Sequence, residues 1–231
     1  MNGTCNYILD SMTRLGLDYG EALKQAQQKG YAEANPSTDV DGIDTWHKLI
    51  LSSNIAFGIS VDREGVPAAG IRQISAEDVE NFKAHNLVCK LIATGKYENG
   101  RCHLYVQPTL VGSGEPEANV PSNYNLITLV GRWSNRMSFF GQGAGRYPTA
   151  YNVVQDCADI LSGNGFYCDG LEKVSATNDC CLRYYVRGDK DTWLENVTEE
   201  NWGEAVITKP VSVNEMHAWL KAHPASFIAA L

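Results

Sequence analysis

The first third of the chain carries apolar residues at the spacing of helices. Apolar positions recur every three or four residues in segments 4–15, 19–29, 42–57 and 76–85. Thr4, or Asn2 before it, is the expected N-cap of the first helix, which Gly16 ends. Gly30 is typical of the left-handed residue that closes a helix such as the second one. Ser75, followed by two acidic residues, predicts the N-cap of the fourth.

From residue 87 the period shortens toward two, which indicates strands. Two strands meet at Asn99-Gly100, a strong hairpin signal, and segments 125–133 and 136–141 predict a second hairpin that turns at Ser134-Asn135. Further on, segments 182–187 and 205–208 alternate like strands, and Ser212 caps a helix over 213–223. Runs of strands flanked by runs of helices favour an α+β fold over a doubly wound one. We therefore predict a mixed or antiparallel sheet covered by helices on one face.

Composition and charge narrow the function classes. With 231 residues the chain can bury a full core, as one domain or one domain with a small second one. Acidic groups outnumber basic ones 27 to 19, which argues against nucleic-acid and anionic-lipid partners. No apolar run has the length of a membrane span, and the N-terminus lacks the shape of a secretion signal.

The seven cysteines predict reduced thiols rather than a disulfide framework, because their number is odd in a chain of this length. A cytoplasmic location is therefore expected. Cys157, Cys168, Cys180 and Cys181 are the only grouping that suggests zinc, yet no C-x-x-C spacing occurs. We expect no metal site.

The densest candidate chemistry lies in residues 30–48, which hold the carboxylates Glu33, Asp39, Asp41 and Asp44 and the amine of Lys48. Asp44 and Lys48 are four apart on the predicted helix, so an acid and a base share one face. Two interpretations are open: a solvated surface ion pair, or a pair that works in a site. The other acids favour a site, because clustered like charges repel unless a cation lies among them. The ammonium group of a substrate could be this cation. A metal ion fits poorly, because the spacing of the acidic residues does not match that of an EF-hand loop.

The start of that helix is predicted from its flanking residues. Pro36 bars a helix through segment 33–38, which is therefore expected to be a loop. Asp39 or Asp41 is the expected N-cap.

A glycine-rich loop, Gly141-x-Gly143-x-Gly145, precedes a predicted amphipathic helix over 147–161. Such a loop is either a tight turn or an anion site, because backbone amides at a helix start attract phosphate. It lacks the full spacing and the βαβ context of the dinucleotide fingerprint.

Five ordered blocks resemble the substrate domain of homoserine dehydrogenase, and the resemblance covers residues 1–163. The blocks are Asn2-Gly3-Thr4-Cys5-Asn6-Tyr7-Ile8-Leu9, the segment 22–36 with Gly30-Tyr31-Ala32-Glu33-Ala34-Asn35-Pro36, Asp39-Val40-Asp41-Gly42-Ile43-Asp44 with Lys48, His103-Leu104-Tyr105-Val106-Gln107-Pro108-Thr109-Leu110, and Gly141-Gln142-Gly143-Ala144-Gly145-Arg146-Tyr147-Pro148-Thr149-Ala150.

The resemblance implies a reaction and a role for individual residues. The family interconverts L-homoserine and L-aspartate 4-semialdehyde with NADP or NAD, in the pathway to threonine, methionine and isoleucine. By resemblance Lys48 donates the proton, and Asp44 orients Lys48 and holds substrate. Glu33 binds the substrate ammonium and Asp39 belongs to the same pocket. Gly3 and Thr4 line that pocket, while Gly30, Gly143 and Gly145 approach the cofactor.

The resemblance also sets the expected organisation. Residues 1–163 would form the substrate and catalytic domain, and residues 164–231 a small α/β appendix of unknown role. The family's sheet meets its copy in a homodimer, so a dimer is expected. No segment matches the family's nucleotide-binding domain, so Met1 is either a true start or an internal residue of a longer protein. We expect the chain alone to be inactive, and to work with a separate nucleotide-binding chain if it is half of a split enzyme. The alternative is a non-catalytic amino-acid-binding or dimerising module.

Overall fold

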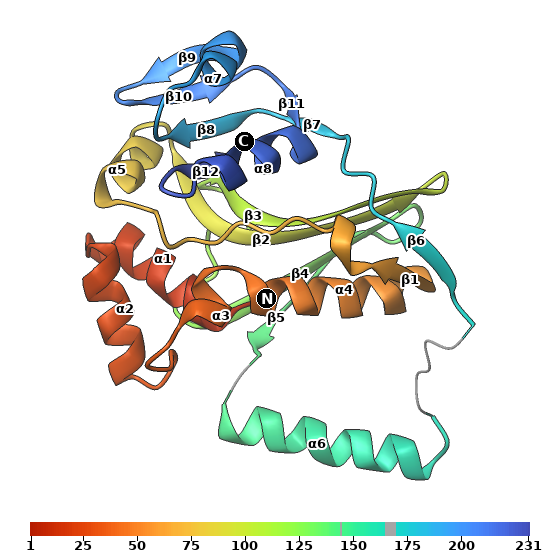
Figure 1. Cartoon of the computed structure of the whole chain (residues 1–231). Coiled ribbons are helices and arrows are strands. Elements are labelled where there is room, and N and C mark those ends of the chain that lie inside the picture. The colour runs from red at the N-terminus through yellow and green to blue at the C-terminus, as the bar shows by residue number, and fades with distance from the viewer. Residues whose placement is uncertain (144, 165–169) are drawn as a thin grey trace.

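A computed structural model describes residues 1–143, 145–164 and 170–231 (Figure 1). The helices are α1 Gly3–Leu15, α2 Tyr19–Gln28, α3 Ser37–Val40, α4 Ile43–Phe57, α5 Ala76–Ala84, α6 Arg146–Leu161, α7 Thr192–Val197 and α8 Val213–Ala222, with a 3₁₀ turn at Arg63–Gly65. The strands are β1 Ile59–Asp62, β2 Leu87–Glu98, β3 Arg101–Gly112, β4 Tyr124–Gly131, β5 Asn135–Gln142, β6 Glu172–Ser175, β7 Cys181–Leu182, β8 Tyr184–Arg187, β9 Thr198–Trp202, β10 Ala205–Thr208, β11 Val211–Ser212 and β12 Phe227–Ala230.

The largest sheet has six strands in the order β2-β3-β12-β8-β10-β9. β2 and β3 form a long antiparallel hairpin in register from Leu87↔Gly112 to Glu98↔Arg101. β12 runs parallel to β3 and antiparallel to β8, so the sheet is mixed. The α+β fold with a mixed sheet that was predicted from the sequence is confirmed.

Most helix boundaries follow from their capping residues. Asn2 is the N-cap of α1, and its side chain accepts a hydrogen bond from the Cys5 backbone amide at 2.8 Å. Ser75 and Ser212 open α5 and α8 with full capping boxes. The predicted N-cap of α4 is wrong. The N-cap of α4 is Gly42, which has a φ of 82° and no side chain to cap the helix, because Asp39 already lies in α3 and Asp41 ends it.

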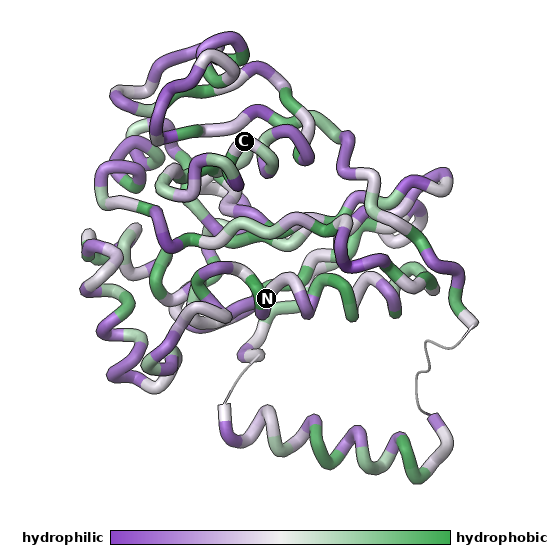
Figure 2. The backbone as a smooth tube through the Cα atoms, viewed as in Figure 1, coloured by the Kyte–Doolittle hydropathy of each residue, from purple (hydrophilic) through white to green (hydrophobic). Residues whose placement is uncertain are grey.

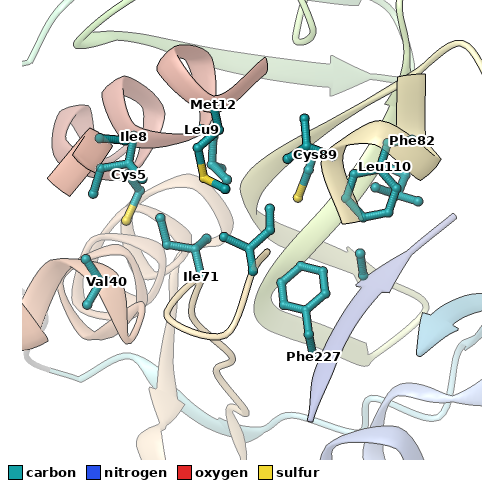
Figure 3. Packing of buried hydrophobic residues seen from close by; sticks show 14 of the residues in the cluster. Cys5, Ile8, Leu9, Met12, Val40, Ile71, Phe82, Cys89, Leu110 and Phe227 are labelled. Atoms are coloured by element: carbon teal, nitrogen blue, oxygen red, sulfur yellow. The ribbon is translucent and has the colours of Figure 1, made fainter. Parts of the chain in front are cut away.

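The main core lies between the sheet and the N-terminal helices (Figure 3). Cys5, Ile8 and Met12 of α1 pack with Phe82 of α5 and with Phe227 of β12. These side chains are almost fully buried, and each large one contributes about 1.5–3 kcal/mol by leaving water. Alternate residues of β8, β10 and β12 pack on α7 and α8, so helices cover both faces at that end of the sheet, which corrects the expectation of helices on one face only.

The C-terminal segment is joined to the rest by shared strands and by one buried ion pair. β12 lies between β3 and β8, within the same sheet as the N-terminal hairpin. Asp78 of α5 is fully buried, and the Arg187 guanidinium of β8 donates to both its oxygens at 2.7 and 2.9 Å. The Tyr185 hydroxyl donates to the same carboxylate at 2.8 Å. Whether a domain boundary falls at residue 163 stays a prediction.

The β4–β5 hairpin and α6 both expose large apolar side chains. β4 and β5 form a separate hairpin, and α6 has no buried residue along its described length. Figure 2 shows hydrophobic stretches, drawn in green, between polar ones along α6. Figure 1 draws α6 apart from the main body. Among the described residues, no helix combines the length and the apolar character that crossing a membrane requires.

Candidate active site

Asp44 and Lys48 form the predicted pair on α4. The Lys48 Nζ donates to Asp44 Oδ2 at 2.8 Å and to the Met1 carbonyl oxygen at 3.2 Å. The Lys48 side chain is 47% exposed and that of Asp44 27%, so the amine can reach a molecule in solution. The pair lies in the first two turns of α4, close to the N-terminus of the chain (Figure 1).

Asn2 joins this pair to Asp39, which sequence reasoning did not foresee. Its buried Nδ2 donates to Asp39 Oδ1 at 2.6 Å and to Asp44 Oδ2 at 2.8 Å. The same side chain caps α1 through its oxygen. One asparagine therefore fixes the start of α1 and two carboxylates from α3 and α4. The position of Asn2 at the start of a helix indicated its capping role. Its bonds to Asp39 and Asp44 could not be predicted, because these partners lie 37 and 42 residues away along the chain.

Asp41 does not belong to this cluster, which corrects the expectation that all four acids share an external cation. The Arg72 Nε donates to Asp41 Oδ1 at 2.7 Å and its Nη2 to Oδ2 at 2.8 Å. This two-pronged pair with Asp41 raises the pKa of the Arg72 guanidinium. The cation that compensates Asp41 is thus the chain's own arginine.

Gly3 and Thr4 bring other segments to the start of α1. The Thr4 hydroxyl donates to the Tyr31 carbonyl oxygen at 2.5 Å, which holds the turn after α2 beside α1. A Cβ on Gly3 would lie 2.8 Å from the Asn123 carbonyl oxygen, so only glycine lets that segment approach so closely. Gly30 has a φ of 74°, as expected for a left-handed residue after α2, and nothing lies within 4 Å of its Cβ position.

The Glu33 carboxylate is not brought into contact with the other acids. Glu33 is exposed, and its backbone carbonyl oxygen accepts a hydrogen bond from Gln27 Nε2 at 3.0 Å. Its role in binding an ammonium group stays a prediction. Residues 33–36 are irregular, as Pro36 indicated, but the predicted loop over 33–38 ends early, because the short helix α3 begins at Ser37.

A buried lysine that the sequence did not single out lies close to this site. The Lys90 Nζ of β2 donates to Asn6 Oδ1 at 2.8 Å and to the Val120 carbonyl oxygen at 2.9 Å. Burial lowers the pKa of Lys90 to about 8, because removing the ammonium group from water disfavours its charged form. Asn6 also donates to the Ser122 carbonyl oxygen at 2.7 Å. Together they fasten segment 120–122 to α1, beside Asn2.

The glycine-rich loop lies at the start of α6. Gly145 precedes that helix with a φ of 129°, a conformation that favours glycine. A Cβ on Gly143 would lie 2.5 Å from the side-chain nitrogen Nδ2 of Asn125 in β4, so a larger residue here would require that side chain to move. Neither glycine is in recorded contact with the Asp44–Lys48 pair.

These features define a class: an α+β domain that holds a half-exposed lysine among aspartates at the meeting point of α1, α3 and α4. A family profile for homoserine dehydrogenase matches residues 1–158. The chain belongs to the homoserine dehydrogenase family, a family of oxidoreductases.

Individual relatives agree with this assignment. The homoserine dehydrogenase of Synechocystis sp. is 42% identical over 165 residues, which are 70% of this chain and 38% of that protein. That of Bacillus subtilis is 33% identical over 195 residues, 81% of this chain and 45% of its own length. The chain thus spans less than half of these curated relatives.

Solved structures extend the likeness beyond the matched profile. A homoserine dehydrogenase from Thiobacillus denitrificans superposes with a TM-score of 0.78 at 28% identity, over 100% of this chain and 62% of that one. A hyperthermophilic archaeal homoserine dehydrogenase in complex with NADPH gives a TM-score of 0.55 at 24% identity, over 70% of this chain and 46% of that one. The second comparison bears on the fold alone.

Proposed function

We propose that this chain is the substrate-binding and catalytic part of a homoserine dehydrogenase, which interconverts L-homoserine and L-aspartate 4-semialdehyde. The observation that carries the proposal is the Lys48 Nζ held 2.8 Å from Asp44, with Asp39 tied to the same carboxylate through Asn2. The chain would act in the cytoplasm, in biosynthesis of the aspartate-derived amino acids threonine, methionine and isoleucine.

The charge of the cluster fits an amino-acid substrate. The side chains of Asp39 and Asp44 contribute two negative charges and that of Lys48 one positive charge, so the side chains alone have a net charge of −1, which would attract an α-ammonium group. Glu33 would add a further carboxylate to that ammonium, and Gly3 and Thr4 would line the pocket. Asp44 would both orient Lys48 and hold substrate.

Lys48 is the proposed proton donor. When an aldehyde becomes an alcohol, its oxygen gains negative charge, and an ammonium group beside that oxygen stabilises the charge and then supplies the proton. In the reverse direction the amine accepts the hydroxyl proton. The hydrogen bond to Asp44 fixes where the amine points, because a free lysine side chain samples many rotamers.

The reaction also needs a hydride, which a nicotinamide cofactor supplies when it is bound. Gly30 and Gly145 would face that cofactor, since each has a positive φ and no side chain of its own. No side chain lies within 4 Å of the Gly30 Cβ position, so its backbone is open to approach. We propose NADP or NAD as the cofactor. Most of its binding surface would come from a nucleotide-binding domain, so the chain alone would be inactive.

Two exposed apolar surfaces, one on the β4–β5 hairpin and one on α6, are each a candidate binding surface for a protein partner. Ile127, Leu129, Met137 and Phe139 lie on one face of the β4–β5 hairpin by register, and each is 43–54% exposed. We propose that this face meets a second copy of the chain. α6 exposes Tyr147, Val154 and Leu161, and a separate nucleotide-binding chain is the proposed partner there.

Calorimetric titration of L-homoserine into the 231-residue chain tests the proposal. We expect saturable binding, with an affinity at least about tenfold lower in Asp44→Asn, because a charged partner of the ammonium is lost. Asp156→Asn removes an exposed carboxylate of α6 and should bind normally. 4-Hydroxybutanoate, which lacks the ammonium group, should bind far more weakly. Equal binding of both compounds would refute the proposed pocket.

A further inference from the structure

A cavity lies away from the Asp44–Lys48 pair. It has a volume of about 460 Å³ and opens between residues 67–73 and the C-terminal elements α8 and β12. This volume falls in the range of small-molecule sites, roughly 300–1,000 Å³. The Gln73 Nε2 donates across its edge to the Pro224 carbonyl oxygen at 3.4 Å, so the two walls are in contact.

The charge of its lining differs in sign from that of the whole chain. Four titratable side chains line the cavity: Asp41, Arg72, His217 and Lys221. Burial lowers the pKa of His217 to about 4, so this ring is neutral at pH 7. Two cations and one carboxylate leave a net charge of +1 here, in a chain whose net charge is −8. The cavity therefore favours an anion.

The two cations are in different situations. Arg72 is already held by Asp41 through two hydrogen bonds. Lys221 is exposed at the end of α8 and, within the described ranges, takes part in no salt bridge. Leu220 and Phe227 supply apolar wall beside it. A ligand that matches both the Lys221 ammonium group and this apolar wall has one negative group and a short aliphatic body.

We propose that this cavity binds a small aliphatic carboxylate, whose carboxylate group is taken by Lys221 with support from Arg72. The aliphatic body lies against Leu220 and Phe227. The proposal rests on the cavity and its charges and does not depend on dehydrogenase activity.

The cavity and the candidate active site share a wall. Asp39 and Asp41 lie two residues apart, yet Asp39 bonds to Asn2 while Asp41 bonds to Arg72 at the cavity. The Ile71 backbone amide donates to the Val40 carbonyl oxygen at 2.7 Å, and this bond connects segment 67–73, which lines the cavity, to α3. A bound carboxylate therefore steadies α3, and with it Asp39.

The probe is 4-methylpentanoate, titrated calorimetrically into the full chain. We expect saturable binding, and at least about tenfold weaker binding of 4-methylpentanamide, which keeps the shape but lacks the charge. Lys221→Glu should weaken binding of the carboxylate by at least about tenfold. Lys24→Glu makes the same change of net charge on the exposed face of α2 and should bind like the unchanged chain.

Hydrogen exchange locates the binding. The carboxylate should slow exchange of the Ile71 amide in the unchanged chain and in Lys24→Glu, but not in Lys221→Glu. The proposal is overturned by absence of saturable binding in the unchanged chain, by equal binding of acid and amide, or by a Lys221→Glu variant that binds normally.

Discussion

At the scale of single residues, the chain separates its acids by giving them different partners. Asp41 is neutralised by a guanidinium, whereas Asp39 is held by the neutral amide of Asn2. Asp39 therefore adds a negative charge to the site that the Asn2 amide does not neutralise. Lys48 forms an ion pair with Asp44, the other carboxylate of the site. A substrate ammonium group would neutralise the remaining negative charge, and we therefore propose an amino-acid substrate for this pocket.

His217 gives a pH prediction at this scale. Burial lowers its pKa from 6.5 to about 4, so the unfolded chain binds more protons than the folded chain between these values. Stability contributed by the neutral ring is complete above pH 6.5 and is lost as the pH falls toward 4, by at most roughly 3 kcal/mol. His217→Gln should remove this part of the pH dependence.

Urea unfolding at several pH values between 4 and 7 measures the effect as the difference between His217→Gln and the unchanged chain. His47→Gln, which removes an exposed histidine of α4, is the control and should leave the pH dependence unchanged. A His217→Gln variant whose stability falls with acid as steeply as that of the unchanged chain would contradict the assignment of a buried neutral ring.

What the sequence could predict at this scale was the local part of the site. Spacing alone placed Asp44 and Lys48 on one face of a helix, and the ion pair has that geometry. Asn2 and Arg72 could not be assigned, because each reaches its partner across more than 30 residues. Whether Glu33 works with these groups remains a prediction.

At the scale of elements, the loop before α5 positions α3. A Cβ on Gly70 would lie 2.1 Å from the Val40 carbonyl oxygen and 2.4 Å from the Asp41 Cα, which are both backbone atoms. Gly70→Ala must therefore displace α3 or the loop. We expect a loss of about 1–3 kcal/mol in the free energy of unfolding, together with weaker L-homoserine binding, because α3 carries Asp39.

Gly114→Ala is the matched control for Gly70→Ala. Nothing lies within 4 Å of the Gly114 Cβ position, so this change should stay within about 0.5 kcal/mol. Urea unfolding and homoserine titration of both variants provide the test. Unchanged stability and unchanged affinity in Gly70→Ala would mean that the loop does not hold α3.

Elements with strong local signals were predictable, and those defined by distant pairing were not. Caps and periodicity indicated α1, α2, α5 and α8, and Asn99-Gly100 marked the β2–β3 hairpin. The helix α7 and the strand β12 were missed. The four residues of β12 are a strand because β3 and β8 bond to them from either side, which local sequence does not reveal.

At the scale of the whole molecule, the exposed apolar face of the β4–β5 hairpin predicts self-association. Phe139→Asp places a charge in the centre of that face, and burying it against a second copy would be costly. We expect sedimentation to give a dimer for the unchanged chain and a monomer for Phe139→Asp.

Val130→Asp adds the same charge on the opposite face of the hairpin, where Val130 is 79% exposed, and should remain a dimer. An unchanged chain that sediments as a monomer would contradict the proposed face. So would a Phe139→Asp variant that keeps the dimer mass.

The central claim is that Lys48 performs proton transfer in homoserine dehydrogenation. The most direct test mixes the chain with a separately produced nucleotide-binding domain of a homoserine dehydrogenase and follows formation of reduced cofactor from L-homoserine and NADP. We expect turnover in the mixture only, a loss of at least about 100-fold in Lys48→Met, and normal turnover in Lys24→Met. Turnover that survives in Lys48→Met would refute the claim, and homoserine binding without turnover in any mixture would instead support a non-catalytic binding module.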